Sequence, residues 1–137
     1  MAEGEKVPLL SVPWIERYGE LWNQNQKAIE GTRGLAESWT VEMRVTDIDG
    51  REPVQINIVA DGTSDYTGPV RGEKDPMFRL SAPTETWRKV AKGEMGIKRA
   101  VTGPIKFQGS LVTALKYFSG LEAALRQFGD VPTAEWD

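Results

Sequence analysis

The sequence has 137 residues, of which 39% are hydrophobic and 27% are charged, and its net charge is -3. This size and composition indicate one globular domain with its own core, and the small negative charge argues against nucleic acid as the main partner. The absence of cysteine excludes disulfides and thiolate metal sites, and the absence of histidine removes the commonest metal ligand and general base.

The first element that the sequence predicts is an N-terminal helix over about 11–30. Ser11 can cap this helix, and Pro13 suits its first turn because no N–H is needed there. Behind them, apolar residues recur at helical spacing and form one stripe. The stripe consists of Trp14, Ile15, Tyr18, Leu21, Trp22 and Ile29. The sequence "GTRG", which begins at Gly31, then ends the helix.

A meander of strands follows over about 38–81, and its clearest part is a hairpin centred on Asp49-Gly50. This dipeptide favours a two-residue type I′ turn, and apolar residues alternate strictly on both sides of it. Such a turn would pair apolar residues on one face and polar residues on the other. The apolar pairs would be Val45–Val54, Met43–Ile56, Val41–Ile58 and Trp39–Ala60, and the polar pairs Arg44–Gln55 and Glu42–Asn57.

The rest of the chain combines two short strands with helices. A second turn at Asp61-Gly62 leads into a strand over about 64–70, and "MFRLS" predicts another from Met77 to Ser81. A helical segment over about 84–102, a strand over about 104–109 and a C-terminal helix over about 110–128 follow. Runs of strands followed by helices favour an α+β fold, in which helices pack on one face of a single sheet.

The C-terminal helix has an apolar face that is wider than a sheet requires. Its apolar residues cover about half of the circumference, whereas a helix that rests on a sheet needs a stripe of roughly 100°. They are Leu111, Ala114, Leu115, Tyr117, Phe118, Leu121, Ala124, Leu125 and Phe128. Three interpretations remain open: ordinary core under neighbouring helices, a dimer interface, and the wall of a cavity for an apolar ligand.

Four sequence features favour the third interpretation together. They are the "TDIDG" hairpin, the strand-to-helix segment "RLSAPTETWRKVAKGE", the glycine-flanked segment "GIKRAVTGPIKFQG" and the leucine-rich terminal helix. With these features, the stretch from about Trp39 to Phe128 resembles the sterol carrier protein 2 (SCP2) family of lipid-binding domains. The resemblance implies a single five-stranded, mostly antiparallel sheet with helices on one face and an apolar tunnel between them. It also implies binding of sterols, fatty acids, fatty acyl-CoA or phospholipids without chemical change.

We choose the candidate ligand-binding residues from the predicted faces of the strands and helices. Known ligand contacts of that family play no part in the choice. Each of the candidates alone is an ordinary core residue, and only the set favours a pocket. The set is Met43, Ile56, Ile58, Phe78, Leu80, Trp87, Phe107, Leu111, Leu115 and Phe118.

A basic stretch suggests a place for a lipid head group. Six cations crowd one region, opposed there only by Glu85 and Glu94. The cations are Arg88, Lys89, Lys92, Lys98, Arg99 and Lys106. Among them, Lys98, Arg99 and Lys106 are candidates to receive a phosphate or carboxylate group or to touch an anionic lipid surface. The simpler interpretation is a solvated helix face.

We therefore expect a single domain over 1–137 that carries a hydrophobic small molecule and is not an enzyme. No phosphate-binding loop, dinucleotide motif, nucleophile elbow or metal-ligand spacing occurs in the sequence, so we expect no catalytic residue, cofactor or metal. The start of the chain lacks a secretory signal, and no apolar run reaches the roughly 20 residues of a membrane span, so we expect a cytoplasmic protein. The alternative function is an interaction module that uses the apolar helix face for homodimerisation or for docking to a lipid-metabolism enzyme.

Overall fold

The protein was analysed as a computed structural model that describes residues 6–33, 39–71, 78–96, 99–100, 103–109, 111–116 and 118–136. Within these ranges, the side chains of 39, 111, 114, 115, 118 and 119 are not described.

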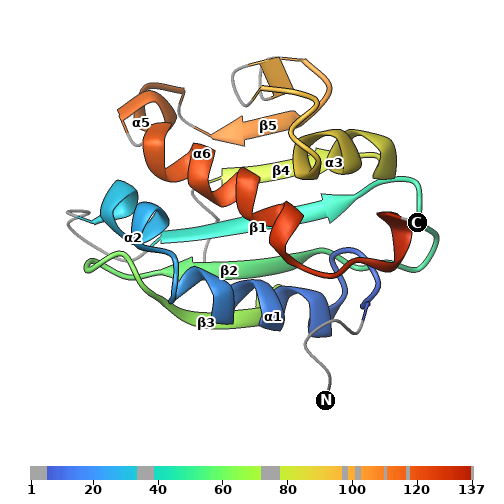
Figure 1. The fold of residues 1–137 in the computed structure, drawn as a ribbon, viewed down its shortest axis with the longest axis horizontal. Coiled ribbons are helices and arrows are strands. Elements are labelled where there is room, and N and C mark those ends of the chain that lie inside the picture. Colours follow the sequence, from blue (N-terminus) through green and yellow to red (C-terminus); the bar gives the residue numbers. More distant parts are fainter. Residues whose placement is uncertain are drawn as a thin grey trace.

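The structure is built on one five-stranded sheet (Figure 1). Its strands lie in the order β3-β2-β1-β4-β5. β1 pairs with β4 in parallel, and the other three pairs are antiparallel. The strands are β1 (Trp39–Val45), β2 (Val54–Ile58), β3 (Ser64–Pro69), β4 (Phe78–Ala82) and β5 (Lys106–Gly109). The predicted α+β class and mostly antiparallel five-stranded sheet are confirmed.

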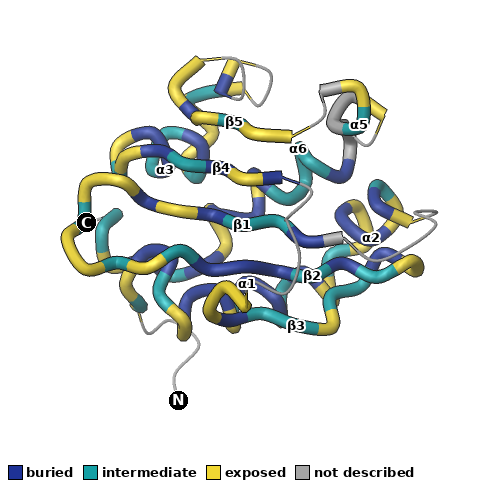
Figure 2. Tube along the Cα trace, turned by 180° about the vertical axis from the view of Figure 1, so that it is seen from behind, coloured by how far each residue is buried: buried dark blue, intermediate teal, exposed yellow. Residues whose placement is uncertain are grey.

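Helices cover one face of the sheet and leave the other open. α1 packs on β3 and β2, α6 packs on α2, and α3 contacts the end of α6 (Figure 1). Seen from behind, the strands are not covered by helices (Figure 2). The helices are α1 (Val12–Trp22), α2 (Gln26–Thr32), α3 (Thr84–Ala91), α5 (Leu111–Lys116) and α6 (Phe118–Arg126), with 3-10 turns η1 (Gln127–Asp130) and η2 (Ala134–Trp136). The apolar sides of the strands therefore meet the helices, as alternation predicts.

The predicted N-terminal helix over 11–30 is wrong as a single element, because the chain forms α1 and α2 with a break between them. Ser11 caps α1 as predicted: its hydroxyl accepts a hydrogen bond from the Trp14 N–H. Asn23 then uses its side-chain amide to bond the backbone of Ser64 at the start of β3, donating at 3.1 Å and accepting at 2.8 Å. Asn25 caps the new helix by accepting from the Ala28 N–H at 3.2 Å. The two asparagines thus turn α2 away from α1 and toward α6.

The predicted hairpin register is also wrong, by two residues. Val41 lies opposite Ile56 and Met43 opposite Val54, and the chain between the strands is a loop over 46–53. A turn does form at the predicted dipeptide, since the Arg51 N–H donates to the Ile48 carbonyl and Gly50 has a φ of 74°. Because side chains alternate with a period of two, the slip leaves the paired residues from Val41 to Val45 and from Val54 to Ile58 on their predicted faces.

Long-range contacts explain why the strands stop short of that turn. The Thr46 N–H donates to the Ala82 carbonyl, and one Asp47 carboxylate oxygen accepts from both the N–H and the hydroxyl of Thr84, at 2.9 and 2.7 Å. On the other side of the loop, Arg51 donates to the Leu9 carbonyl. These partners lie outside the hairpin and hold the loop open. One of these contacts also caps α3: Thr84 is the first residue of α3, and its N–H donates to the Asp47 carboxylate.

Replacing Asp47 by alanine is expected to lower the free energy of unfolding by about 0.5–1 kcal/mol, the usual value of a solvent-exposed helix cap. The hydrogen bonds from Thr84 hold the pKa of Asp47 below its ordinary value of 3.8. The carboxylate therefore stabilises the fold fully above about pH 4 and loses this effect as the pH falls through the lowered folded-state pKa. Urea unfolding at pH 7 and pH 3 measures both effects. Asp49→Ala, in the same loop, is the control and should change stability by less than about 0.5 kcal/mol at either pH.

Candidate ligand-binding cavity

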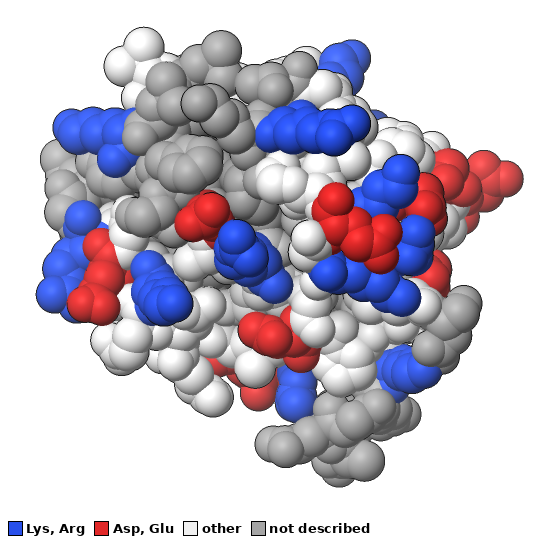
Figure 3. All heavy atoms as spheres, turned by 45° about the horizontal axis from the view of Figure 1, so that its top comes forward, with Lys and Arg blue, Asp and Glu red and all other residues white. Residues whose placement is uncertain are grey.

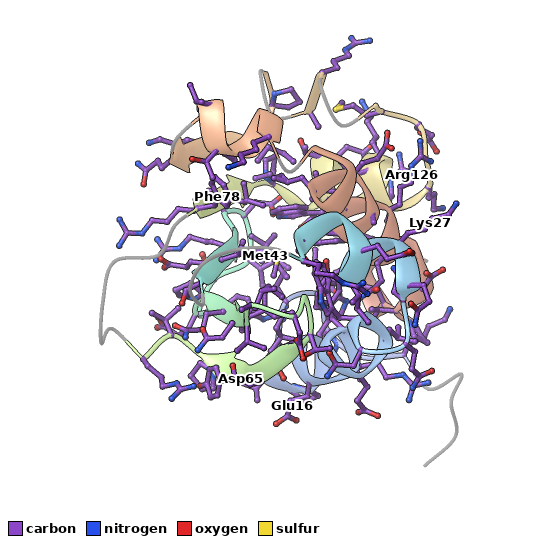
Figure 4. The ribbon with its side chains drawn as sticks, turned by 90° about the vertical axis from the view of Figure 1, so that its left-hand side faces the viewer. Glu16, Lys27, Met43, Asp65, Phe78 and Arg126 are labelled. Atoms are coloured by element: carbon purple, nitrogen blue, oxygen red, sulfur yellow. The ribbon has the colours of Figure 1, made fainter. Side chains whose placement is uncertain are left out.

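An apolar space lies in the interior between the sheet and α6. Three strands supply its floor, α6 and η1 its roof, and α1 one end. Met43 lies in this interior layer, whereas Glu16, Lys27 and Arg126 lie at the outer surface (Figure 4). The lining residues are Tyr18, Trp22, Val41, Met43, Ile56, Ile58, Phe78, Leu80, Gly120, Leu121, Ala124, Leu125 and Phe128. None of these lining residues is charged.

The enclosed space is small in this form of the protein. Its volume is about 30 Å³, which is the share of one water molecule in the liquid. A space with so apolar a lining does not bind water well, because water needs two to four polar partners. The tunnel implied by the resemblance is wider than this space and stays a prediction.

Tyr18 is the one lining residue with a hydroxyl group, and that group is already bonded. It donates to the Ala124 carbonyl of α6 at 2.5 Å. Burial raises the pKa of Tyr18 far above its ordinary value, so the phenol stays neutral at physiological pH. Buried Gln127 ties the same region together: its amide donates to the Tyr18 carbonyl and accepts from the Asn25 side chain, both at 2.9 Å. Hydrogen bonds therefore join the end of α6 to α1 and α2, whereas the contacts between α6 and the sheet are apolar.

α6 approaches α2 closely because a glycine lies at the crossing. A β-carbon on Gly120 would lie 2.7 Å from the Thr32 methyl and 2.8 Å from the carbonyl carbon of Gly31. Backbone atoms cannot move aside as a flexible side chain can. Gly120 therefore sets how near α6 lies to its neighbours, and it also lines the cavity.

Gly120→Ala is expected to destabilise the protein by about 1–2 kcal/mol, because the overlap outweighs the gain of about 1 kcal/mol in helix propensity. Thermal unfolding should show a melting temperature lower by several degrees. Gly96→Ala is the matched control, since nothing lies within 4 Å of its added carbon. Equal melting temperatures for the two variants would contradict the close crossing.

The structure brings together half of the candidate ligand-binding residues. Met43, Ile56, Ile58, Phe78 and Leu80 line the cavity. Two other aromatic candidates, Trp87 and Phe107, lie outside the lining set. Trp87 is fully buried, stacks on Phe128 with ring centroids 4.8 Å apart, and donates its indole N–H to the Arg44 carbonyl. Phe107 is half-buried and packs against Phe78 with ring centroids 5.3 Å apart.

The remaining candidates are either exposed or outside the described part of the chain. The side chains of Leu111, Leu115 and Phe118 are not among those described, nor is Lys98. Arg99 and Lys106 are exposed at the surface and take no part in the cavity lining.

Sequence reasoning passed over the other eight lining residues, although it had marked most of them as apolar. Tyr18 and Trp22 belong to the predicted stripe of the first helix, and Leu121, Ala124, Leu125 and Phe128 belong to the wide face of the last one. The choice from the last helix fell on its first half, because nothing in the periodicity distinguishes one end of a helix from the other.

Comparison with known proteins identifies the fold. No family profile matches the sequence, and no curated protein is similar to it. A crystal structure of sterol carrier protein 2 superposes with a TM-score of 0.71 at 18% identity and covers 90% of this chain and 98% of its own. A conserved hypothetical protein of Thermus thermophilus, described as possibly a sterol carrier protein, gives a TM-score of 0.69 at 16% identity, with 98% and 97% of the chains covered.

An enzyme contains a similar unit. A double mutant of a sec-alkyl sulfatase superposes with a TM-score of 0.55 at 12% identity, over 75% of this chain and 15% of its own.

The described helices include none that is long and apolar enough to cross a bilayer. The match to two structures over almost their full lengths settles the architecture: the chain has the fold of sterol carrier protein 2.

Proposed function

We propose that the protein binds a hydrophobic small molecule between α6 and the sheet and carries it without changing it chemically. The observation that carries this proposal is the lining itself: thirteen residues from three strands and three helical segments face one space without a charged group. The fold supports the proposal, because the structures it matches include a sterol carrier protein. A fatty acid, a fatty acyl-CoA, a sterol-like molecule or a phospholipid has the apolar part that such a lining would accept.

Binding requires α6 to move away from the sheet, since about 30 Å³ holds no alkyl chain. The contacts between α6 and the sheet are apolar on both sides, so an apolar ligand can replace these contacts without leaving polar groups of the sheet unpaired. Burying about sixteen methylenes contributes on the order of 13 kcal/mol, against an association cost of about 4–15 kcal/mol. When the association cost lies in the lower part of this range, the net binding free energy corresponds to a micromolar or lower Kd.

The same lining supports a carrier without catalysis. Among the described lining residues the one hydroxyl, on Tyr18, donates to Ala124 and has a raised pKa, so it offers no base near neutral pH. A charged head group would find no charged partner and no unbonded hydroxyl group among the described lining residues, so it would stay at the protein surface. Exposed Arg99 and Lys106, together with Lys98, are the proposed contacts for it.

Gel filtration combined with thermal unfolding tests this function against the interaction-module alternative. A carrier should elute as a monomer, and palmitoyl-CoA should raise its melting temperature, since a ligand at 100 times Kd adds about 2.7 kcal/mol to the free energy of unfolding. A dimer whose melting temperature ignores palmitoyl-CoA, palmitate and cholesterol would support the interaction module and contradict the carrier.

A further inference from the structure

One long stretch of the sequence lacks acidic residues altogether. The chain contains 20 Asp and Glu residues among 137, yet none occurs between Met95 and Leu121, a stretch of 27 residues. Four cations lie in that stretch: Lys98, Arg99, Lys106 and Lys116. The stretch therefore carries a charge of +4 in a chain whose net charge is -3, which leaves -7 on the rest. Charge is strongly segregated along the sequence.

The fold gathers β5, α5 and Arg99, which belong to the described part of this stretch, on one side of the protein. β5 is an edge strand of the sheet, and α5 starts directly beyond its end, so both lie along the upper rim in Figure 1. Lys106 on β5, Lys116 on α5 and Arg99 are all exposed. When this rim is turned forward, the coloured side chains at its top are basic only (Figure 3).

The same edge exposes an apolar side chain. Val112 has 79% of its surface exposed, whereas the next most exposed large hydrophobic residue among those described, Val12, has 37%. Val112 and Lys116 are separated by four residues on α5, so they share one face of the helix. An exposed apolar residue next to lysines is the arrangement that peripheral proteins present to a lipid interface.

We propose that this β5–α5 edge docks on a membrane that contains anionic phospholipids, with Val112 entering the interface and Arg99, Lys106 and Lys116 facing the head groups. Each cation near an anionic surface adds to the electrostatic attraction between protein and membrane. A single apolar side chain inserts into the interface but is too small to anchor the protein there irreversibly. A second copy of the chain is a poor partner, because the exposed cations of two such edges repel and one valine is far smaller than a stable interface requires. Nucleic acid would use the lysines but would leave Val112 without an apolar partner.

The proposal shares Arg99 and Lys106 with the proposed head-group contacts of the cargo, and it is measured without cargo so that the two can fail independently. Since the chain has no cysteine, Val112→Cys provides a unique site for an environment-sensitive fluorophore. On vesicles of phosphatidylcholine with 30 mol% phosphatidylglycerol, we expect the label to brighten and shift to the blue, and 0.5 M NaCl to reverse the change. Vesicles of phosphatidylcholine alone should give a much weaker response. The same label on Val12→Cys, on α1, should not respond. An equal response of both labels would overturn the proposed orientation.

Paired lysine variants test the electrostatic part. Lys106→Gln combined with Lys116→Gln should weaken partitioning onto the anionic vesicles by about 25-fold, or about fivefold for each cation. Lys27→Gln combined with Lys92→Gln changes the net charge equally at exposed sites outside the edge, and it should stay within about twofold of the unaltered protein. Equal vesicle affinities for the two double variants would overturn the proposal. So would lysine-dependent binding to a DNA duplex without binding to anionic vesicles.

Discussion

Replacing Phe128 by alanine will lower the free energy of unfolding by about 3–5 kcal/mol, the largest effect that we expect from one substitution. Phe128 is fully buried, and its ring lies 4.8 Å from Trp87, 4.9 Å from Trp14 and 5.5 Å from Tyr18, measured between centroids. These partners come from α3 and α1, so the ring joins the end of α6 to two other helices. Removing the ring leaves a cavity that the surrounding aromatic rings cannot close.

Denaturant unfolding of the purified variant measures this loss. Val112→Ala is the control, because that side chain is 79% exposed and its truncation should change stability by less than about 0.5 kcal/mol. A loss below about 1 kcal/mol for Phe128→Ala would mean that the four rings do not pack as a unit.

Filling the cavity should abolish most ligand binding. Ala124 lines the space under α6, and leucine at this position would occupy the volume into which an alkyl chain must enter. We expect Ala124→Leu to weaken the binding of a fluorescent fatty acid by about tenfold or more, which corresponds to about 1.4 kcal/mol or more of lost binding free energy. The backbone carbonyl that accepts from Tyr18 remains in the variant.

The neighbouring residue gives a matched control for this variant. Ala123 faces an outer groove between α2 and α6, together with Lys27 and Glu122. Ala123→Leu adds the same atoms to the same helix, so its ligand affinity should stay within about twofold of the unaltered protein. If both variants lost affinity equally, the ligand would not lie in the space under Ala124.

The sequence predicted well what depends on local periodicity. Alternation placed Met43, Ile56 and Leu80 on the inner face, and this assignment survived an error of two residues in the hairpin register. The order of strands and helices favoured the α+β class for the same reason: periods of two and of 3.6 are visible in one sequence without knowledge of its neighbours.

The errors arose where distant residues decide the local structure. Asn23 ends α1 by bonding Ser64, 41 residues away, and Asp47 leaves the hairpin to cap Thr84, 37 residues away. Neither contact is visible in a short window of sequence. The site shows the same limit, because periodicity marked both ends of the last helix as apolar and only the packed structure shows which residues face the cavity.

The central claim is that the interior opens to hold one hydrophobic molecule, and native mass spectrometry of the purified protein tests it most directly. The account predicts a protein species with one bound lipid, either co-purified or acquired on incubation with palmitoyl-CoA, palmitate or cholesterol, and a loss of that species in Ala124→Leu. A protein that stays ligand-free with all three, while its unaltered mass is observed throughout, would show that the space under α6 is a closed core.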